Sequence, residues 1–158
     1  MMLNQVQLIT YVDRLGGGDI ASLQSLLDGP LSGVFGGVHL LPFFDTIDGA
    51  DAGFDPIDHT RVDPRLGDWQ DIKRLSESLP VMADVIVNHM SSDSPQFRDW
   101  SARGAASAFR DLFLTLSTVF PDGASEDALL AVYRPRPGLP LTYATLANGE
   151  RKILWTTF

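Results

Sequence analysis

The sequence contains no cysteine, which excludes disulfide bonds and thiolate metal sites. Basic residues are few: 12 Lys and Arg stand against 20 Asp and Glu, for a net charge of −8. This excess of acids argues against broad binding to nucleic acid or to anionic lipid. No apolar run approaches the roughly 20 residues of a membrane span, and the start, MMLNQVQLITYVDR, lacks the basic and apolar regions of a signal peptide. We therefore expect a cytoplasmic protein.

The chain does have enough apolar residues for a core, since 44% of its 158 residues are hydrophobic. Apolar runs and helical spacing alternate along its first half. They predict strands at 6–12, 36–44 and 81–87, with helices at 19–29 and 68–79 between them and a long polar loop at 45–67. Near-continuous apolar strands alternating with helices indicate a parallel sheet of the α/β class that is covered on both faces.

The alternation stops after residue 90. The following residues are irregular and partly helical, and residues 143–158 predict a hairpin in which Asn148-Gly149 forms a type I′ turn. We expect two parts: residues 1–89 with the strand–helix repeats, and residues 90–158 as an inserted subdomain of loops and short strands.

Polar residues gather where the third predicted strand ends, in the stretch VMADVIVNH. In parallel α/β folds ligands bind at the carboxyl ends of the strands, so Asn88 and His89 indicate a site. Asp84, within the strand, is expected to orient its neighbours through buried hydrogen bonds. Val85 is expected to be a buried strand residue, and His39, in the second strand, to belong to the core.

These residues resemble a known family. DVIVNH is similar to the first conserved motif of the alpha-amylase superfamily, an Asp-x-x-x-Asn-His at the end of the third barrel strand. Over nearly the whole chain, VQLITYVDRLG, GVHLLPFF, DGADAGFDPIDHTRVDPRLGDW, FRDLFLTLSTVFPDGA and YRPRPGLP resemble the sucrose phosphorylases of that superfamily (glycoside hydrolase family 13). The resemblance implies strands 1–3 of a (β/α)8 TIM barrel with a loop-rich subdomain inserted after strand 3. The barrel is incomplete here, because a whole one takes roughly 250 residues.

The resemblance also implies an activity: sucrose and inorganic phosphate are converted to glucose 1-phosphate and fructose by a retaining double displacement, without a cofactor. A homodimer is possible for the full-length enzyme. The family's nucleophilic aspartate and acid/base glutamate lie on barrel strands four and five, which this chain does not contain, so we expect the chain alone to be inactive. The alternatives are another glucoside phosphorylase or a sucrose hydrolase of the same superfamily, or a non-catalytic truncated fragment.

Several residues match the family's glucosyl site. The match places the carboxylate of Asp51 on glucose hydroxyls, where an ionised acceptor makes strong hydrogen bonds; from the residues alone, an aspartate capping a turn is the alternative. His89 is expected to donate to a sugar hydroxyl near the reacting carbon. Phe54 and Phe158 resemble the aromatic walls on either side of the glucosyl ring, although a phenylalanine is more commonly a core residue.

The motif YRPRPGLP suggests an acceptor loop, with Tyr133 and Arg136 as candidates for contacts with phosphate or fructose. A guanidinium group matches phosphate bidentately, and the prolines lower the entropy cost of ordering the loop. A surface loop with solvated arginines is an equal alternative. Asn88 is a metal ligand in calcium-binding amylases, but no second acidic cluster has metal-ligand spacing here, and we expect no metal.

Overall fold

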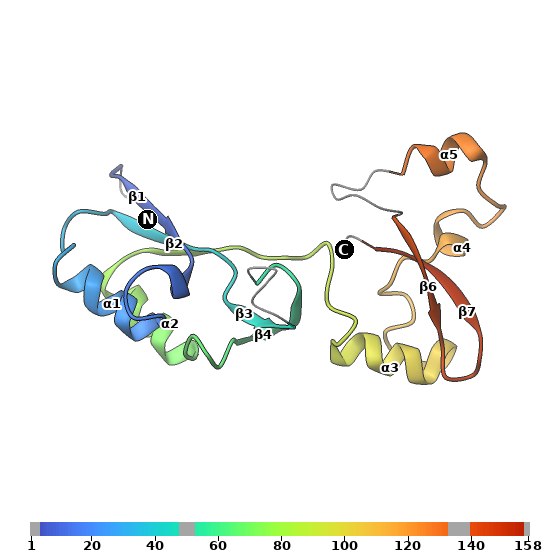
Figure 1. Ribbon diagram of the computed structural model, residues 1–158, viewed down its shortest axis with the longest axis horizontal. Helices are drawn as coiled ribbons and strands as arrows, with labels where there is room; N and C mark the ends of the chain where they lie inside the picture. The colour runs from blue at the N-terminus through green and yellow to red at the C-terminus, as the bar shows by residue number, and fades with distance from the viewer. Residues whose placement is uncertain (1–3, 48–52, 133–139, 157–158) are drawn as a thin grey trace. The chain divides into compact units, whose positions relative to one another are not determined.

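The structure, a computed structural model, describes residues 4–47, 53–132 and 140–156. Its chain divides into two compact units, Met1–Ser91 and Ser92–Phe158 (Figure 1). Each unit has a hydrophobic core of its own. None of the helices within the described ranges is long and apolar enough to span a membrane.

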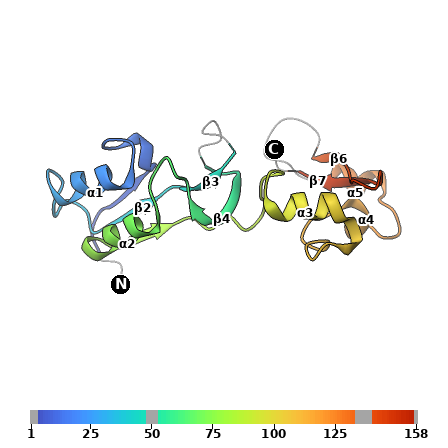
Figure 2. The ribbon, with the colours of Figure 1, turned by 90° about the horizontal axis from the view of Figure 1, so that it is seen from below.

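The first unit is a parallel sheet with helices on one side. Its elements are β1 (Gln7–Thr10), a 3-10 helix (Val12–Arg14), α1 (Ile20–Asp28), β2 (Gly37–Leu40), β3 (Phe44–Thr46), β4 (Pro56–Val62), α2 (Trp69–Ser78) and β5 (Val81–Ala83). The strands β1, β2 and β5 pair in that order, all parallel, which confirms the predicted α/β sheet. Figures 1 and 2 show α1 and α2 on the same side of this sheet.

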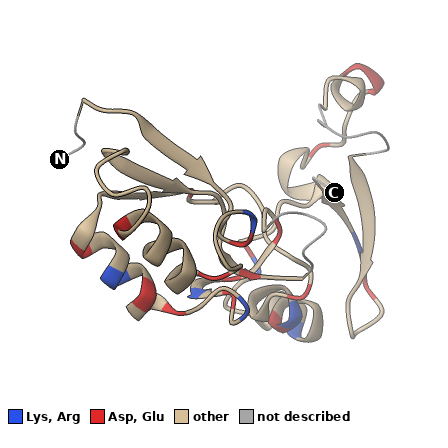
Figure 3. Cartoon of the chain, turned by 60° about the vertical axis from the view of Figure 1, so that its left-hand side comes forward, with Lys and Arg blue, Asp and Glu red and all other residues tan. Residues whose placement is uncertain are grey.

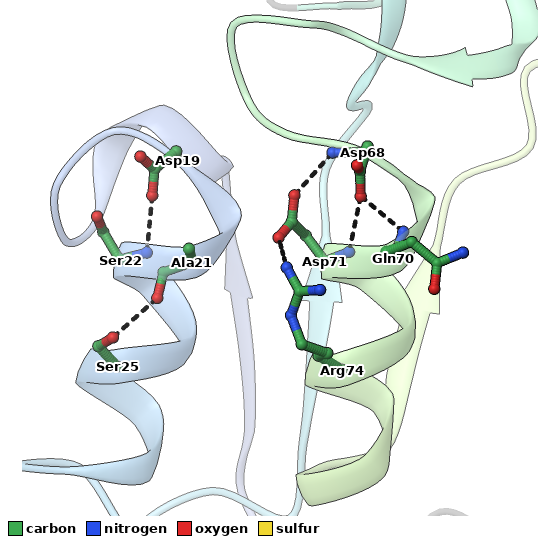
Figure 4. A network of polar contacts seen from close by, with 8 residues as sticks. All are labelled: Asp19, Ala21, Ser22, Ser25, Asp68, Gln70, Asp71 and Arg74. Atoms are coloured by element: carbon green, nitrogen blue, oxygen red, sulfur yellow. Dashed lines mark hydrogen bonds and ion pairs between the residues drawn. The ribbon is translucent and has the colours of Figure 1, made fainter.

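Both helices begin at aspartates that cap them (Figure 4). Asp19 Oδ1 accepts the backbone N–H of Ser22 at 2.7 Å, and this hydrogen bond lowers the pKa of the Asp19 carboxyl. Asp68 Oδ1 accepts from the backbone N–H of Asp71 at 3.0 Å, while Asp71 Oδ2 accepts from that of Asp68 at 2.8 Å. Such reciprocal capping satisfies N–H groups that a helix leaves unpaired, so these local signals fix where the helices start.

Within the described residues, helices cover only one face of the sheet, whereas the sequence predicts that both are covered. Val38 and Leu40 point toward the helices and are buried at 1% and 0% exposure. The alternate row, Ile9–His39–Met82 in register, points away from the helices, and Ile9 and Met82 are 63% and 40% exposed. The expectation that His39 belongs to the core is therefore wrong, because its position in the pleat turns it to the helix-free face.

The third strand of the sheet is shorter than predicted. β5 ends at Ala83 because its partner β2 ends opposite, at Leu40, and in the described part of the chain no other strand pairs with residues 84–88. Val85 is 74% exposed rather than buried, and Val87 is 84% exposed. The prediction of a strand through Val87 with Val85 in the core is wrong for this chain.

The predicted polar loop at 45–67 contains an antiparallel hairpin, β3–β4. Aromatic side chains hold its base: the Phe43 ring lies 4.9 Å from Phe44 and 5.8 Å from Trp69, centroid to centroid. Trp69 Nε1 also donates to the Thr60 carbonyl at 2.7 Å. The sequence PIDHTRV hides this strand because its polar residues outnumber its apolar ones.

The second unit packs a hairpin against a short helix. Its elements are α3 (Pro95–Arg103), a 3-10 helix (Gly104–Ala106), α4 (Leu116–Val119), α5 (Glu126–Leu130), β6 (Leu141–Thr145) and β7 (Arg151–Trp155). Trp100 of α3 is buried against Leu146 and Leu154 of the hairpin, and the Phe113 ring lies 5.4 Å from the Trp100 ring. A hairpin in this region was predicted, and β6 pairs with β7.

The turn of that hairpin differs from the prediction. The backbone N–H of Gly149 donates to the Leu146 carbonyl at 2.9 Å, and Leu146 N–H donates to Glu150 at 2.8 Å. Residues 147–149 thus form a three-residue connection that ends in Gly149 at φ 83°. A type I turn followed by a left-handed glycine has this pattern, so Asn148-Gly149 is not a two-residue type I′ turn.

A buried carboxylate fixes the end of the β3–β4 hairpin. Asp63 follows β4, its side chain is 7% exposed, and its oxygens accept from Arg65 Nε at 3.0 Å and Nη2 at 2.5 Å. Burial raises the pKa of the Asp63 carboxyl, but the hydrogen bonds and positive charge of Arg65 together lower it below its ordinary value. The Asp63 backbone also bonds Phe43, since its N–H donates to that carbonyl at 2.9 Å.

We expect Asp63 to make the stability of the chain sensitive to acid. A lowered folded pKa contributes stability that is complete above the unfolded value, about pH 4 for an aspartate, and is lost as the pH falls from there through the folded value. Thermal unfolding followed by circular dichroism across this range should show a steeper fall in Tm for the wild type than for Asp63→Asn. Parallel curves for the two proteins would contradict this role.

Candidate functional site

The parallel strands of the first unit direct their following residues to one edge of the sheet. β1 leads into the 3-10 helix at Val12–Arg14, β2 leads into the β3–β4 hairpin, and β5 leads into residues 84–91. The three strands themselves contain no Asp, Glu, Lys or Arg (Figure 3). Charged and polar groups therefore begin where the strands end, as in other parallel α/β folds.

Hydrogen bonds join the segment after β5 to the β3–β4 hairpin. His89 Nε2 lies 2.5 Å from the carbonyl oxygen of Phe54, and the backbone N–H of Ser91 donates to Pro56 at 2.9 Å. Ser91 is 1% exposed. On the hairpin side, Thr46 Oγ1 donates to the Asp55 carbonyl at 2.8 Å, which closes the hairpin just before Pro56.

The position of the ring proton of His89 follows from its neighbours. Asn88 Nδ2 lies 2.9 Å from His89 Nδ1, and an amide N–H can only donate, so Nδ1 accepts. Nε2 of the neutral ring then carries the proton and donates it to the Phe54 carbonyl. Both ring nitrogens thus have protein partners, and the imidazole ties the strand end to the hairpin.

The structure brings together two of the predicted site residues. His89 and Phe54 are both half-buried and are joined through the Phe54 carbonyl. The other candidates, Asp51, Tyr133, Arg136 and Phe158, lie outside the described residues.

The sequence did not reveal the partner of Asp84. Asp84 Oδ1 lies 3.0 Å from His39 Nε2, with the two side chains 33% and 20% exposed. The residues stand 45 positions apart, and only the parallel register of β2 and β5 brings them together. A register assignment that placed His39 beside Met82 would have found the pair, because Asp84 lies on the same face two residues on.

A hollow of about 170 Å³ lies at the ends of β1 and β2. Its charged side chains form two neighbouring ion pairs, Asp13–Arg14 at 3.4 Å and Asp63–Arg65 at 2.5 Å. Sites for drug-sized molecules measure about 300–1,000 Å³, so this hollow alone is too small for a disaccharide.

Within residues 4–47, 53–132 and 140–156, no group of three or more His, Asp or Glu could hold a metal ion. The groups that the structure brings together near Asn88 are hydrogen-bonding ones.

Known proteins are similar to this chain in sequence and in fold. The chain is 58% identical to a sucrose phosphorylase of Agrobacterium vitis and 55% identical to one of Bifidobacterium adolescentis, over 99% of this chain in both comparisons. It spans about a third of their length, 32% and 31%. The crystal structure of sucrose 6F-phosphate phosphorylase from Thermoanaerobacter thermosaccharolyticum superposes on the whole chain, and on 32% of its own, with a TM-score of 0.89 and 38% identity.

Family membership follows from a match over most of the chain. Residues 16–132 match the alpha-amylase catalytic domain. The chain belongs to the alpha-amylase family and is homologous to the sucrose phosphorylases over its whole length.

Proposed function

We propose that this chain is the glucosyl-binding, N-terminal part of a sucrose phosphorylase. The observation that carries the proposal is the 58% and 55% identity to two sucrose phosphorylases over 99% of the chain. The contact between His89 and Phe54 supports it, because it joins two residues that match the family's glucosyl site. Sucrose and phosphate are the proposed substrates, and glucose 1-phosphate and fructose the products.

The proposed reaction is a double displacement with retention. A carboxylate attacks the anomeric carbon of the glucosyl unit, the bond to the fructosyl oxygen breaks, and a carboxylic acid gives that oxygen its proton. A phosphate oxygen then attacks the same carbon, and the carboxylate leaves. Both carboxyl groups are assigned to parts of the protein outside this chain, so residues 1–158 alone are expected to be inactive.

Within this scheme the residues of the chain hold the sugar. Asp51 accepts hydrogen bonds from glucosyl hydroxyls, and Phe54 and Phe158 lie against the ring. The Nε2–H of His89, which donates to the Phe54 carbonyl here, donates to a sugar hydroxyl instead when the glucosyl ring is bound. Tyr133 and Arg136 are assigned to the side where phosphate or fructose binds.

One alternative has a specific observation in its favour. The structure that superposes at a TM-score of 0.89 is a sucrose 6F-phosphate phosphorylase, 38% identical to this chain. The higher identity to the sucrose phosphorylases favours unphosphorylated sucrose. Rates with sucrose and with sucrose 6F-phosphate, measured on one preparation, separate the two.

A chimera tests the proposal directly. Residues 1–158 replace the matching N-terminal third of the Agrobacterium vitis enzyme, to which they are 58% identical. We expect this chimera to release glucose 1-phosphate from sucrose and phosphate, because the missing carboxyl groups are supplied by the rest of that enzyme. The chain alone is the matched control and should release none. A folded chimera without phosphorolysis would contradict the proposal.

In the active chimera, His89→Ala and Asp51→Ala should each lower kcat/KM for sucrose far more than they lower Tm. Losing one partner of a buried hydrogen bond that strengthens in the transition state costs about 1–3 kcal/mol, or roughly 5- to 150-fold in rate.

The matched control is Leu75→Ala in α2, where the side chain is 0% exposed. A cavity there costs about 2–5 kcal/mol of folding stability and should leave kcat/KM near that of the parent. If His89→Ala behaved like Leu75→Ala, His89 would be a structural residue only.

A further inference from the structure

An acid and a base face each other on the helix-free face of the sheet. His39 Nε2 and Asp84 Oδ1 are 3.0 Å apart, in hydrogen-bond range, and both side chains are mostly covered at 20% and 33% exposure. His39 is the only polar member of its row, between Ile9 on β1 and Met82 on β5.

The register of the sheet explains why the two groups meet. His39 pairs with Met82 in the parallel ladder, and Asp84 follows Met82 by two residues, so it projects from the same face. Asp84 is also the first residue after β5, where the ladder with β2 has ended. The pair thus links β2 to the residue that follows β5, one position beyond the last backbone pair, Leu40–Ala83.

Residues 84–89 continue from the end of β5 to the β3–β4 hairpin. In the described part of the chain no strand pairs with residues 84–88, and Val85 and Val87 are exposed. Ile86 is buried, at 6% exposure. At its far end the segment is held by His89 on the Phe54 carbonyl. The segment is thus attached at its start by the His39–Asp84 hydrogen bond, in its middle by the buried Ile86 and at its end by His89.

We propose that His39 and Asp84 form a positioning pair: by fixing the start of residues 84–89, they set where the His89 imidazole stands in the glucosyl site. The proposal rests on the proposed function for its kinetic consequence. Neither residue touches the sugar. They act through the strand end, and a displacement of about 1 Å far from the chemistry can cost up to about 100-fold in rate.

The test uses the active chimera. His39→Ala and Asp84→Ala should each lower kcat/KM for sucrose by about 10- to 100-fold, with the larger part of the loss in kcat. The double variant should be no worse than either single one, because both remove the same contact. Asp84→Asn keeps an oxygen that accepts from His39 Nε2 and should restore most of the activity.

The matched control is Met82→Ala. Met82 pairs with His39 on the same face of the sheet but is not part of the His39–Asp84 hydrogen bond. It should change Tm by as much as Asp84→Ala while kcat/KM stays near the parent value. If Asp84→Ala lowered only Tm, or if the losses of the two single variants multiplied, the positioning role would be overturned.

A second measurement separates this inference from the proposed function. In the 158-residue chain, long-range 1H–15N NMR reports which His89 nitrogen carries the proton. We expect Nε2–H in the wild type and in Met82→Ala, and a loss of that signature in Asp84→Ala. A folded but inactive chimera would overturn the proposed function, and the NMR signature alone would then test the positioning role of His39 and Asp84. If the His89 ring gave the same signature in Asp84→Ala as in the wild type, the positioning role would be overturned.

Discussion

The hydrogen bond from His89 to the carbonyl of Phe54 is the contact on which the site depends. It joins residues that the sequence separates by the whole of β4 and α2. Asn88 Nδ2 donates to the other ring nitrogen, Nδ1, so the two ring nitrogens have different partners and Nε2 is the one that donates to the carbonyl. The neighbouring hydrogen bond, from the Ser91 N–H to the Pro56 carbonyl, is a second link between the same two segments. Together the two bonds hold the strand end against the hairpin.

This contact depends in turn on how the sheet is built. The helices cover the face on which Leu40 of β2 is buried, and the other face has a polar side chain, His39, on the middle strand. A parallel sheet is normally covered on both faces. This chain matches about a third of the length of its relatives, and the crystal structure of the sucrose 6F-phosphate phosphorylase superposes on all of it. The backbone of this unit, including its helix-free face, therefore has a counterpart in the larger structure of that relative.

Much of this could be predicted from local signals. The helices at 19–29 and 68–79 were predicted from their apolar spacing, and Asp19 and Asp68 cap their first turns by bonds to residues two or three positions away. The three strands were visible as apolar runs. What failed depended on distant partners. Val85 lies in an apolar run that predicts burial, but a side chain there is buried only where another part of the protein covers it, and here it is exposed. The strand at Pro56–Val62 is polar because the hairpin lies outside the sheet, and His39 could be placed only once the helices were known to share one side. Of the site, the motif around His89 was visible, whereas Asp84 had no recognisable partner until the register was known.

The order of the strands along the chain has a consequence for synthesis on the ribosome. β1 and β2 are made first, and residues 41–80, which include the β3–β4 hairpin and α2, separate β2 from β5. The hairpin closes locally by antiparallel pairing, whereas the parallel pairing of β2 with β5 must wait until all of these residues have been made. β5 therefore joins a sheet edge and a hairpin that already exist, and His89 is the last of the described site groups to emerge. Until then the Phe54 carbonyl lacks its imidazole donor, and the nascent first unit lacks the bond that holds its strand end to the hairpin.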